Sequence, residues 1–510
     1  MAASTYEPRL GRTGLNSPEG ARLSDSSLAA SPLTNVAYQL TLLFIVLLVG
    51  RVPEITAQFL GSSFYQILIL NVVLAAFLVI TGTLVKVGIT RGGTILIAFH
   101  LWVLFTLPFS GYRRGSVDAW VGLLPIVPSL FYIGGFVSRS AQTLRRGLWA
   151  FAWAGIIGLA FIHKEGAQLI EDRLSAGEGT FGNSNLVAIY LLLVMPVWAY
   201  IAKNTSYQWV TRLFFMAVIA DSLSLVLKTG SRSGFMTMCI LAVITFTTAT
   251  VANKAKLLVV GVIGVFLAFS LMSENVRSRI GTLFHSEAKD EVSAEAIDSS
   301  GARMALLLES IDVTIKHPLI GTGFGVYSAT AASDKAKKGQ RGLWQVTHNM
   351  YTQVSAELGV PGIFLYLAAV LWSIRTAWRV RRSASVNPRL AELAPMGSAL
   401  ICMWIVFCFN GFFTSMALDF MFYVLSGYSI AIALVFEDVL RRVQIQNSGN
   451  LLPPPRSSRF FPAAPNAVPA PAVVVAGGRQ LAEAADDKNS GAPWKRNPRK
   501  YPPTPGAPSR

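Results

Sequence analysis

The sequence predicts an all-α, polytopic membrane protein with about twelve transmembrane helices and one large extracytoplasmic loop that contains short helices. Hydrophobic residues make up 52% of the 510 residues and charged residues only 14%, and the mean hydropathy is +0.49. A soluble chain of this length needs more polar surface than that. In addition, apolar segments of about 20 residues, enough to cross a bilayer, recur between Val36 and Phe436.

The centres of these apolar segments place the individual spans. Residues 35–273 hold the first nine predicted spans, and residues 361–437 hold the last three. The centres lie near Leu43, Val73, Leu101, Ile126, Gly155, Leu192, Ala220, Ile240, Gly264, Tyr366, Met403 and Ser426.

The tails and loops predict how the chain is oriented. Residues 1–34 are polar and residues 438–510 are rich in Pro, Ala and Arg, so neither tail can bury a core and both are expected to be disordered. Lys and Arg concentrate in alternate short loops, and positive charge near span ends is retained in the cytoplasm. This predicts that both termini are cytoplasmic and that the large loop, residues 274–360, lies outside. The net charge of +17 then reflects inner loops and tails, and we expect no nucleic-acid partner.

Five short motifs occur in the second half of the predicted bundle and in the large loop. The loop motifs follow a helix predicted for residues 303–316, which Pro318 should end. In chain order the motifs read GNSN at 182–185, GSRSG at 230–234, HPLIGTGFG at 317–325, THNMY at 347–351 and ELGVPG at 357–362. Together, over residues 181–436, they resemble the signature of the O-antigen ligase and polymerase superfamily.

The resemblance implies an inverting, metal-independent membrane glycosyltransferase of the GT-C class. Such an enzyme lies in the bacterial inner membrane among membrane lipids, and its active site faces the periplasm. Its donor is a glycan linked to undecaprenyl diphosphate, and its acceptor is a hydroxyl of a lipid A core, of a lipid-linked glycan or of a protein. The resemblance implies no cofactor.

Arginines in the predicted outer segments suit this chemistry. Cleavage of a sugar–diphosphate bond requires stabilisation of a leaving group that gains negative charge. The outer loops lack a cluster of acidic metal ligands, and arginine, with its fixed fork of donors, is the natural substitute. Arg232 and Arg303 lie at the outer membrane edge, where an arginine is costly unless it reaches water or an anion. We predict that both are catalytic residues that hold the diphosphate. Arg113 and Arg114 could also attract it, or could serve as interfacial anchors.

A histidine in the large loop is the predicted general base. His348 suits proton removal from the acceptor hydroxyl near neutral pH, and Asn349 and Tyr351 flank it with polar groups that could orient its ring. Tyr351 could also stack on a sugar. The other histidines lack this context, since His163, for example, is expected in a polar loop without a partner. Asn183 and Asn185 could bind sugar hydroxyls or could only cap a helix.

Two alternative functions remain open from the sequence. One is another lipid-sugar-dependent enzyme, such as a protein O-oligosaccharyltransferase, that uses Glu54 on the first outer loop as its base. The other is a transporter or flippase, which would show more ionisable residues in mid-span than Asp221 and Asp419 and the polar Asn71.

Overall fold

The computed structural model describes residues 31–60, 64–166, 169–170, 173–177, 179–204, 209–283, 291–337, 339 and 344–451. These residues are helical apart from loops and one short antiparallel hairpin, β1 (Leu169–Ile170) and β2 (Arg173–Leu174). Eight of the described helices are long and apolar enough to cross a membrane. The prediction of an all-α, multi-pass membrane protein is therefore confirmed. The predicted disorder of the tails falls almost entirely on residues outside the described ranges.

The helices follow the predicted order. The long apolar ones are α2 (Pro32–Val49), α6 (Arg91–Thr106), α9 (Ala141–Glu165), α10 (Ser184–Asn204), α11 (Trp209–Lys228), α17 (Met350–Val386), α18 (Leu393–Asn410) and α19 (Phe420–Leu451). Between them lie α3 (Val52–Leu60), α4 (Phe64–Ile80), α5 (Thr83–Gly88), α7 (Arg113–Leu123), α8 (Ser129–Tyr132), α12 (Arg232–Thr248), α13 (Val251–Leu271), α14 (Glu274–Gly281), α15 (Glu291–Lys316) and α16 (Tyr327–Lys337).

Every predicted span centre except one lies within a helix, and the exception is Ile126. Here α7 ends at Leu123, a turn follows, and the chain continues through α8 and a π-helical turn, Ile133–Val137. Pro125 and Pro128 explain the break, because proline lacks the amide donor and disfavours helix at the preceding residue. One continuous span at this place was a wrong prediction, and the count of about twelve spans is not confirmed.

The core of the bundle forms around α10 and α19. Almost every side chain of α10 from Val187 to Ala202 is buried, because α9, α11, α12 and α18 pack around it. Trp198 on α10 donates its indole N–H to the Ala152 carbonyl on α9 at 3.0 Å, and Tyr428 on α19 donates to the Gly147 carbonyl at 2.7 Å. Such bonds satisfy polar atoms that lipid could not. The helix α10, whose N-terminal end carries the GNSN motif, is thereby anchored in the middle of the bundle.

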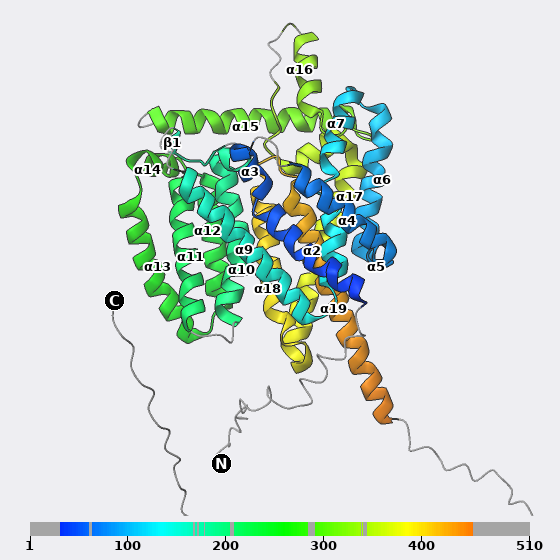
Figure 1. Ribbon diagram of the computed structural model, residues 1–510. Coiled ribbons are helices and arrows are strands. Elements are labelled where there is room, and N and C mark those ends of the chain that lie inside the picture. The colour runs from blue at the N-terminus through cyan, green and yellow to red at the C-terminus, as the bar shows by residue number, and fades with distance from the viewer. Residues whose placement is uncertain are drawn as a thin grey trace, which may run out of the picture. The chain divides into compact units, whose positions relative to one another are not determined.

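The large loop is built on α15, which lies across one end of the helix bundle (Figure 1). The helix ends at Lys316, just before Pro318, as predicted, but it begins at Glu291 instead of residue 303. The additional turns form because Ser293 and Ala296 are buried and because α14 packs against α15. The loop therefore contains one long helix instead of a polar stretch followed by a short one.

The glycine-rich motif and the ELGVPG motif bind each other. The amide of Thr322 donates to the Ala356 carbonyl at 2.9 Å and that of Gly323 to the Glu357 carbonyl at 3.1 Å. The amide of Gly325 donates to Glu357 Oε2 at 3.0 Å. Gly359, with a φ of 69°, kinks α17 at this point, a conformation that favours glycine. We call this pairing of residues 321–325 with residues 356–359 the clasp. The predicted loop boundary at residue 360 coincides with its kink.

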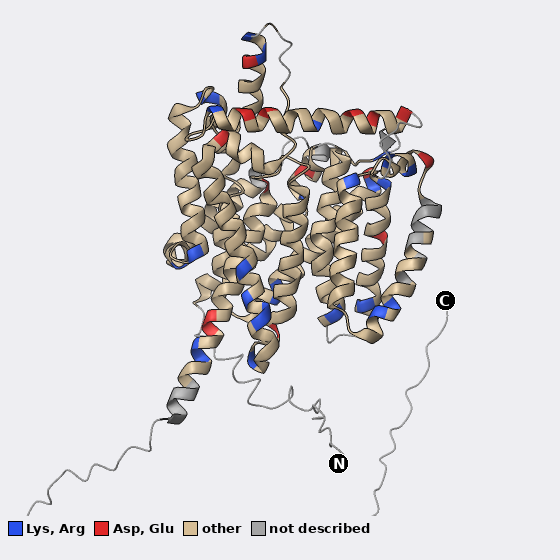
Figure 2. Ribbon diagram, turned by 180° about the vertical axis from the view of Figure 1, so that it is seen from behind, with Lys and Arg blue, Asp and Glu red and all other residues tan. Residues whose placement is uncertain are grey.

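Charged residues are distributed unevenly along the bundle. Figure 2 shows many Lys and Arg at the helix ends opposite α15 and a second group directly beneath α15, while most Asp and Glu lie on or near α15. This distribution agrees with the alternation of positive loops in the sequence, and the sidedness in a membrane stays a prediction. The helix α19 continues to Leu451, beyond the boundary at residue 437 that was expected for the tail.

Candidate active site

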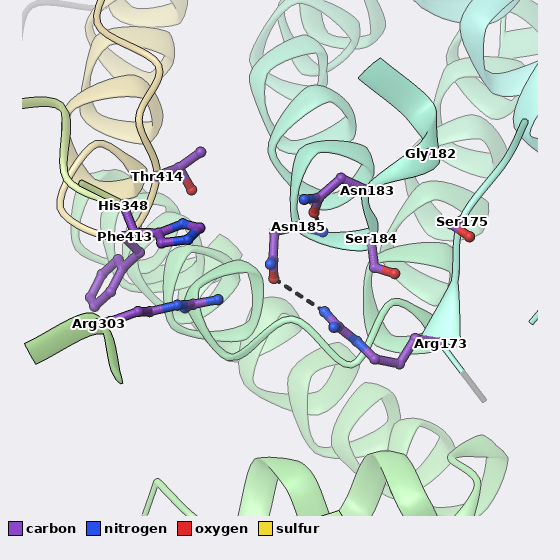
Figure 3. A pocket seen from close by; sticks show the side chains of 10 residues that line it. All are labelled: Arg173, Ser175, Gly182, Asn183, Ser184, Asn185, Arg303, His348, Phe413 and Thr414. Carbon is purple, nitrogen blue, oxygen red and sulfur yellow. Dashed lines mark hydrogen bonds between the residues drawn. The ribbon is translucent and has the colours of Figure 1, made fainter. Parts of the chain in front are cut away.

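Two adjoining cavities lie between α15 and the ends of the helices beneath it. Their volumes are about 310 Å³ and about 300 Å³, and residues from both the GNSN and THNMY motifs line them. They share five lining residues: Arg173, Asn185, Arg303, His348 and Phe413. In Figure 3, Arg303 and His348 face Asn183 and Asn185 across the first cavity. Arg232 lines the second cavity, so the three predicted catalytic residues converge although they are far apart in sequence.

Arg232 and Arg303 are held at neighbouring places by different elements. Arg232 begins α12, whose N-cap Ser231 accepts from the Gly234 amide at 3.2 Å, and its guanidinium donates to Thr282 Oγ1 at 3.3 Å. Arg303 extends from α15, and burial, followed by the charge of Arg279, lowers the pKa of its guanidinium below its ordinary value. Among the described residues, no carboxylate forms an ion pair with either arginine. Within the described ranges, these two arginines therefore bring positive charge to the cavities without a carboxylate partner of their own.

Two further arginines at this site were not predicted. Arg173 on β2 donates from Nε to the Thr229 carbonyl at 3.1 Å and from Nη2 to Asn185 Oδ1 at 3.3 Å. Arg279 on α14 is buried, lines the second cavity and pairs with Glu295 at 3.5 Å. Both arginines fall in segments that the predicted topology places outside. The argument applied to arginines at the membrane edge could have included them.

The backbone around His348 is fixed on both sides. Asn349 caps α17 by accepting from the amides of Tyr351 and Thr352 at 2.9 and 3.1 Å, and its Nδ2 donates to the Phe412 carbonyl at 3.2 Å. The Thr347 hydroxyl lies 2.9 Å from the Ser415 hydroxyl. His348 itself has a φ of 51°, a region that costs roughly 1–3 kcal/mol for a residue other than glycine. The neighbouring bonds hold this strained conformation and direct the ring into the cavity.

The environment of the His348 ring favours its neutral form. Burial, and after it the positive charge of Arg303, lower the pKa of His348 from its ordinary value of 6.5. A neutral imidazole can accept a proton, which the role of general base requires. Within the described ranges, no side chain hydrogen-bonds to the ring, and Tyr351 donates instead to the Cys408 carbonyl at 2.8 Å. Asn349 and Tyr351 therefore do not orient the ring in the way that the sequence suggested.

The remaining predicted substrate-binding residues divide into two groups. Asn183 and Asn185 line the first cavity. The Asn185 amide also donates to Asn183 Oδ1 at 2.9 Å, so Asn183 both caps the start of α10 and lines the cavity. Tyr351 packs its ring on Phe412, with centroids 4.6 Å apart, and is not among the residues that line either cavity. Arg113 and Arg114 are exposed at the start of α7 and do not line the cavities either.

Two acidic residues considered in the alternative functions have other partners. Glu54 forms an ion pair with Arg51 and accepts from the amide and the hydroxyl of Thr180, each at 3.3 Å. Asp221 on α11 lies 2.7 Å from His163 Nε2, and His163 belongs to α9. The prediction of His163 as a loop residue without a partner was wrong. Among the residues that the structure describes, no group of three or more His, Cys, Asp or Glu could hold a metal ion.

The fold is that of a multi-pass α-helical membrane protein, and arginines line the two cavities at one end of its bundle. Residues 213–367 match the O-Antigen ligase family, which implies an enzyme of the membrane glycosyltransferase kind. The matched range contains Arg232, Arg303 and His348. The predicted resemblance to the O-antigen ligase and polymerase superfamily is thus confirmed. No curated protein matches the chain.

Proposed function

We propose that this protein transfers a glycan from undecaprenyl diphosphate to a hydroxyl acceptor at the periplasmic face of the bacterial inner membrane, with inversion and without a metal. The observation that carries the proposal is the convergence of Arg232, Arg303 and His348 on adjoining cavities. A site with unpaired guanidinium groups beside a neutral imidazole suits a reaction that needs both an anion-binding group and a base.

In the proposed reaction the acceptor oxygen attacks the anomeric carbon of the donor sugar. The new carbon–oxygen bond forms on one face of the sugar while the bond to the diphosphate breaks on the other, which inverts the configuration. His348 takes the proton from the acceptor hydroxyl. Arg232 and Arg303 take up the negative charge that develops on the leaving diphosphate, and Asn183 and Asn185 offer hydrogen bonds to sugar hydroxyls.

The family match favours surface-polysaccharide synthesis over protein glycosylation. The acceptor is then a lipid A core, which makes the protein a ligase, or a second lipid-linked glycan, which makes it a polymerase. A protein acceptor is the alternative.

The proposal is tested with purified full-length protein in proteoliposomes that contain an undecaprenyl-diphosphate-linked glycan. Offering lipid A core, a second lipid-linked glycan and a peptide as separate acceptors identifies the acceptor. The wild-type protein should transfer glycan to one of them and release undecaprenyl diphosphate. Donor consumption in none of the three mixtures would contradict the proposal, and movement of the donor between leaflets without glycan transfer would indicate a flippase.

A further inference from the structure

Arg279 on α14 is a buried arginine that lines the second cavity and forms an ion pair with Glu295. Its side chain is 8% exposed, whereas that of its partner, Glu295 on α15, is 51% exposed. Their closest N···O distance is 3.5 Å, longer than the roughly 2.7–2.9 Å of a well-formed charge-assisted hydrogen bond. Because a buried charge is destabilising unless it is well paired, this contact compensates the Arg279 charge only in part.

Other cations surround the Arg279 guanidinium. Arg279 and Arg303 are the charged neighbours of Arg232, and all three line the second cavity. Within the described part of the chain, Glu295 is the one carboxylate that forms an ion pair with any of the three. Three guanidinium groups with one partly exposed carboxylate beside them leave an excess of positive charge at this site.

The backbone near Arg279 is arranged to keep it beside this cluster. The Thr282 hydroxyl accepts from Arg232 at 3.3 Å and donates to the Arg279 carbonyl at 2.7 Å, which links the two arginines through one side chain. Gly230, with a φ of 59°, lies against both unpredicted arginines. A Cβ at that position would stand 3.6 Å from Arg279 Cδ and 3.7 Å from Arg173 Nε. These are ordinary van der Waals distances, so the positive φ, and not a lack of space, favours glycine at the first position of the GSRSG motif.

We propose that Arg279 is a third diphosphate-binding residue and that Glu295 is the counter-ion that it exchanges for the donor diphosphate. This inference rests on the proposed function and adds two residues to it. A diphosphate presents several charged oxygens, so it can meet Arg232, Arg279 and Arg303 together, which a single carboxylate cannot. Glu295 lies at the exposed edge of the cluster, where it can turn towards water when the diphosphate enters. In the empty site it reduces the repulsion among the cations.

The test measures binding of undecaprenyl diphosphate, and separately of inorganic pyrophosphate, to the full-length protein in detergent. Arg279→Gln should weaken binding of both probes about tenfold or more, the usual effect of losing a charge-assisted hydrogen bond. Arg277→Gln is the matched control, since Arg277 lies on the same helix, is exposed and does not line the cavities. Binding by Arg279→Gln that equals the control would overturn the proposal.

Glu295→Gln should change the affinity for the two probes in the opposite direction. Removing the competing carboxylate should tighten binding of both probes about two- to fivefold, the range for an exposed ion pair, and should lower the thermal stability of the ligand-free protein. Glu291→Gln, on the same helix and exposed, should change neither quantity. If Glu295 only tethered α15, its loss would leave binding unchanged or weaken it, and either result would overturn the proposal. This variant also decides the matter if Arg279→Gln fails to fold.

Arg232→Gln separates failure of this inference from failure of the proposed function. Weak binding by Arg232→Gln together with normal binding by Arg279→Gln would leave the proposed function standing and overturn only the role of Arg279. Absence of diphosphate binding and of transfer by the wild-type protein would overturn both.

Discussion

Replacing His348 with alanine tests the assignment of the general base. Burial, and after it the charge of Arg303, lower the pKa of His348 from its ordinary value of 6.5, which favours the neutral ring near neutral pH. Losing a positioned base typically costs about 10²–10⁴ in rate, or about 3–5 kcal/mol of transition-state stabilisation. His348→Ala should therefore lower kcat by that factor while binding of the lipid-linked donor stays close to that of the wild type.

The assay is single-turnover glycan transfer in proteoliposomes between about pH 5 and 9. Wild-type activity should fall on the acid side as His348 becomes protonated, and the loss in His348→Ala should be partly relieved at high pH, where the acceptor hydroxyl ionises more readily. His317→Ala is the control, because His317 is exposed just beyond α15 and does not line the cavities. A folded His348→Ala protein with near-normal kcat, or with an unchanged acid limb, would refute the assignment.

The same geometry predicts a coupling between Arg303 and His348. The positive charge of Arg303 lowers the pKa of His348, so Arg303→Gln should let this pKa rise. The residual activity of Arg303→Gln should then be lost at a higher pH than that of the wild type. A variant that loses activity without any shift of its acid limb would indicate that the two groups do not act on one another.

Three further outcomes follow from the site and the sequence. Arg232→Lys should bind the lipid-linked donor more weakly despite its retained charge, because an ammonium cannot form the two parallel bonds of a guanidinium; normal donor binding would contradict this role. EDTA should leave transfer in proteoliposomes largely unchanged, whereas a loss restored by magnesium or manganese would contradict metal independence. In intact cells, a cysteine at exposed Ser333 on α16 should react with a membrane-impermeant thiol reagent and one at Ser457 should not; the reverse pattern would overturn the topology.

The membrane fold was predictable because length and hydropathy directly report what a bilayer demands. Every span centre except Ile126 lies in a helix. The exception arose because hydropathy does not register the effect of Pro125 and Pro128 on the backbone. The early start of α15 was missed for a related reason, since the packing of Ala296 against neighbouring elements is a tertiary effect that a polar local sequence conceals.

The sequence named three of the residues that line the two cavities as catalytic, and it missed two arginines that line them as well. Arg232 and His348 could be named because each lies in a family motif, and Arg303 could be named because it begins the helix predicted in the large loop. Arg173 and Arg279 lie outside those motifs, and only the folded chain brings them to the cavity. The role of Asn349 was misjudged because adjacency in sequence to His348 suggested a contact, whereas the start of α17 turns its side chain towards the backbone of Tyr351 and Thr352.

The clasp offers a reason why two glycine-rich motifs accompany the residues to which we assign the chemistry. Arg303 extends from α15 and His348 precedes α17, so the separation of these two side chains depends on how the two helices are joined. The clasp makes that joint, because residues 321–325 follow α15 and bond to residues 356 and 357 of α17, and the Val360 amide donates to the Pro318 carbonyl at 2.7 Å. A glycine-rich loop that binds nucleotide phosphates would leave its amides free for the ligand. Here the amides of Thr322, Gly323 and Gly325 are used within the protein, so we expect these motifs to position Arg303 and His348 and not to bind the donor phosphates.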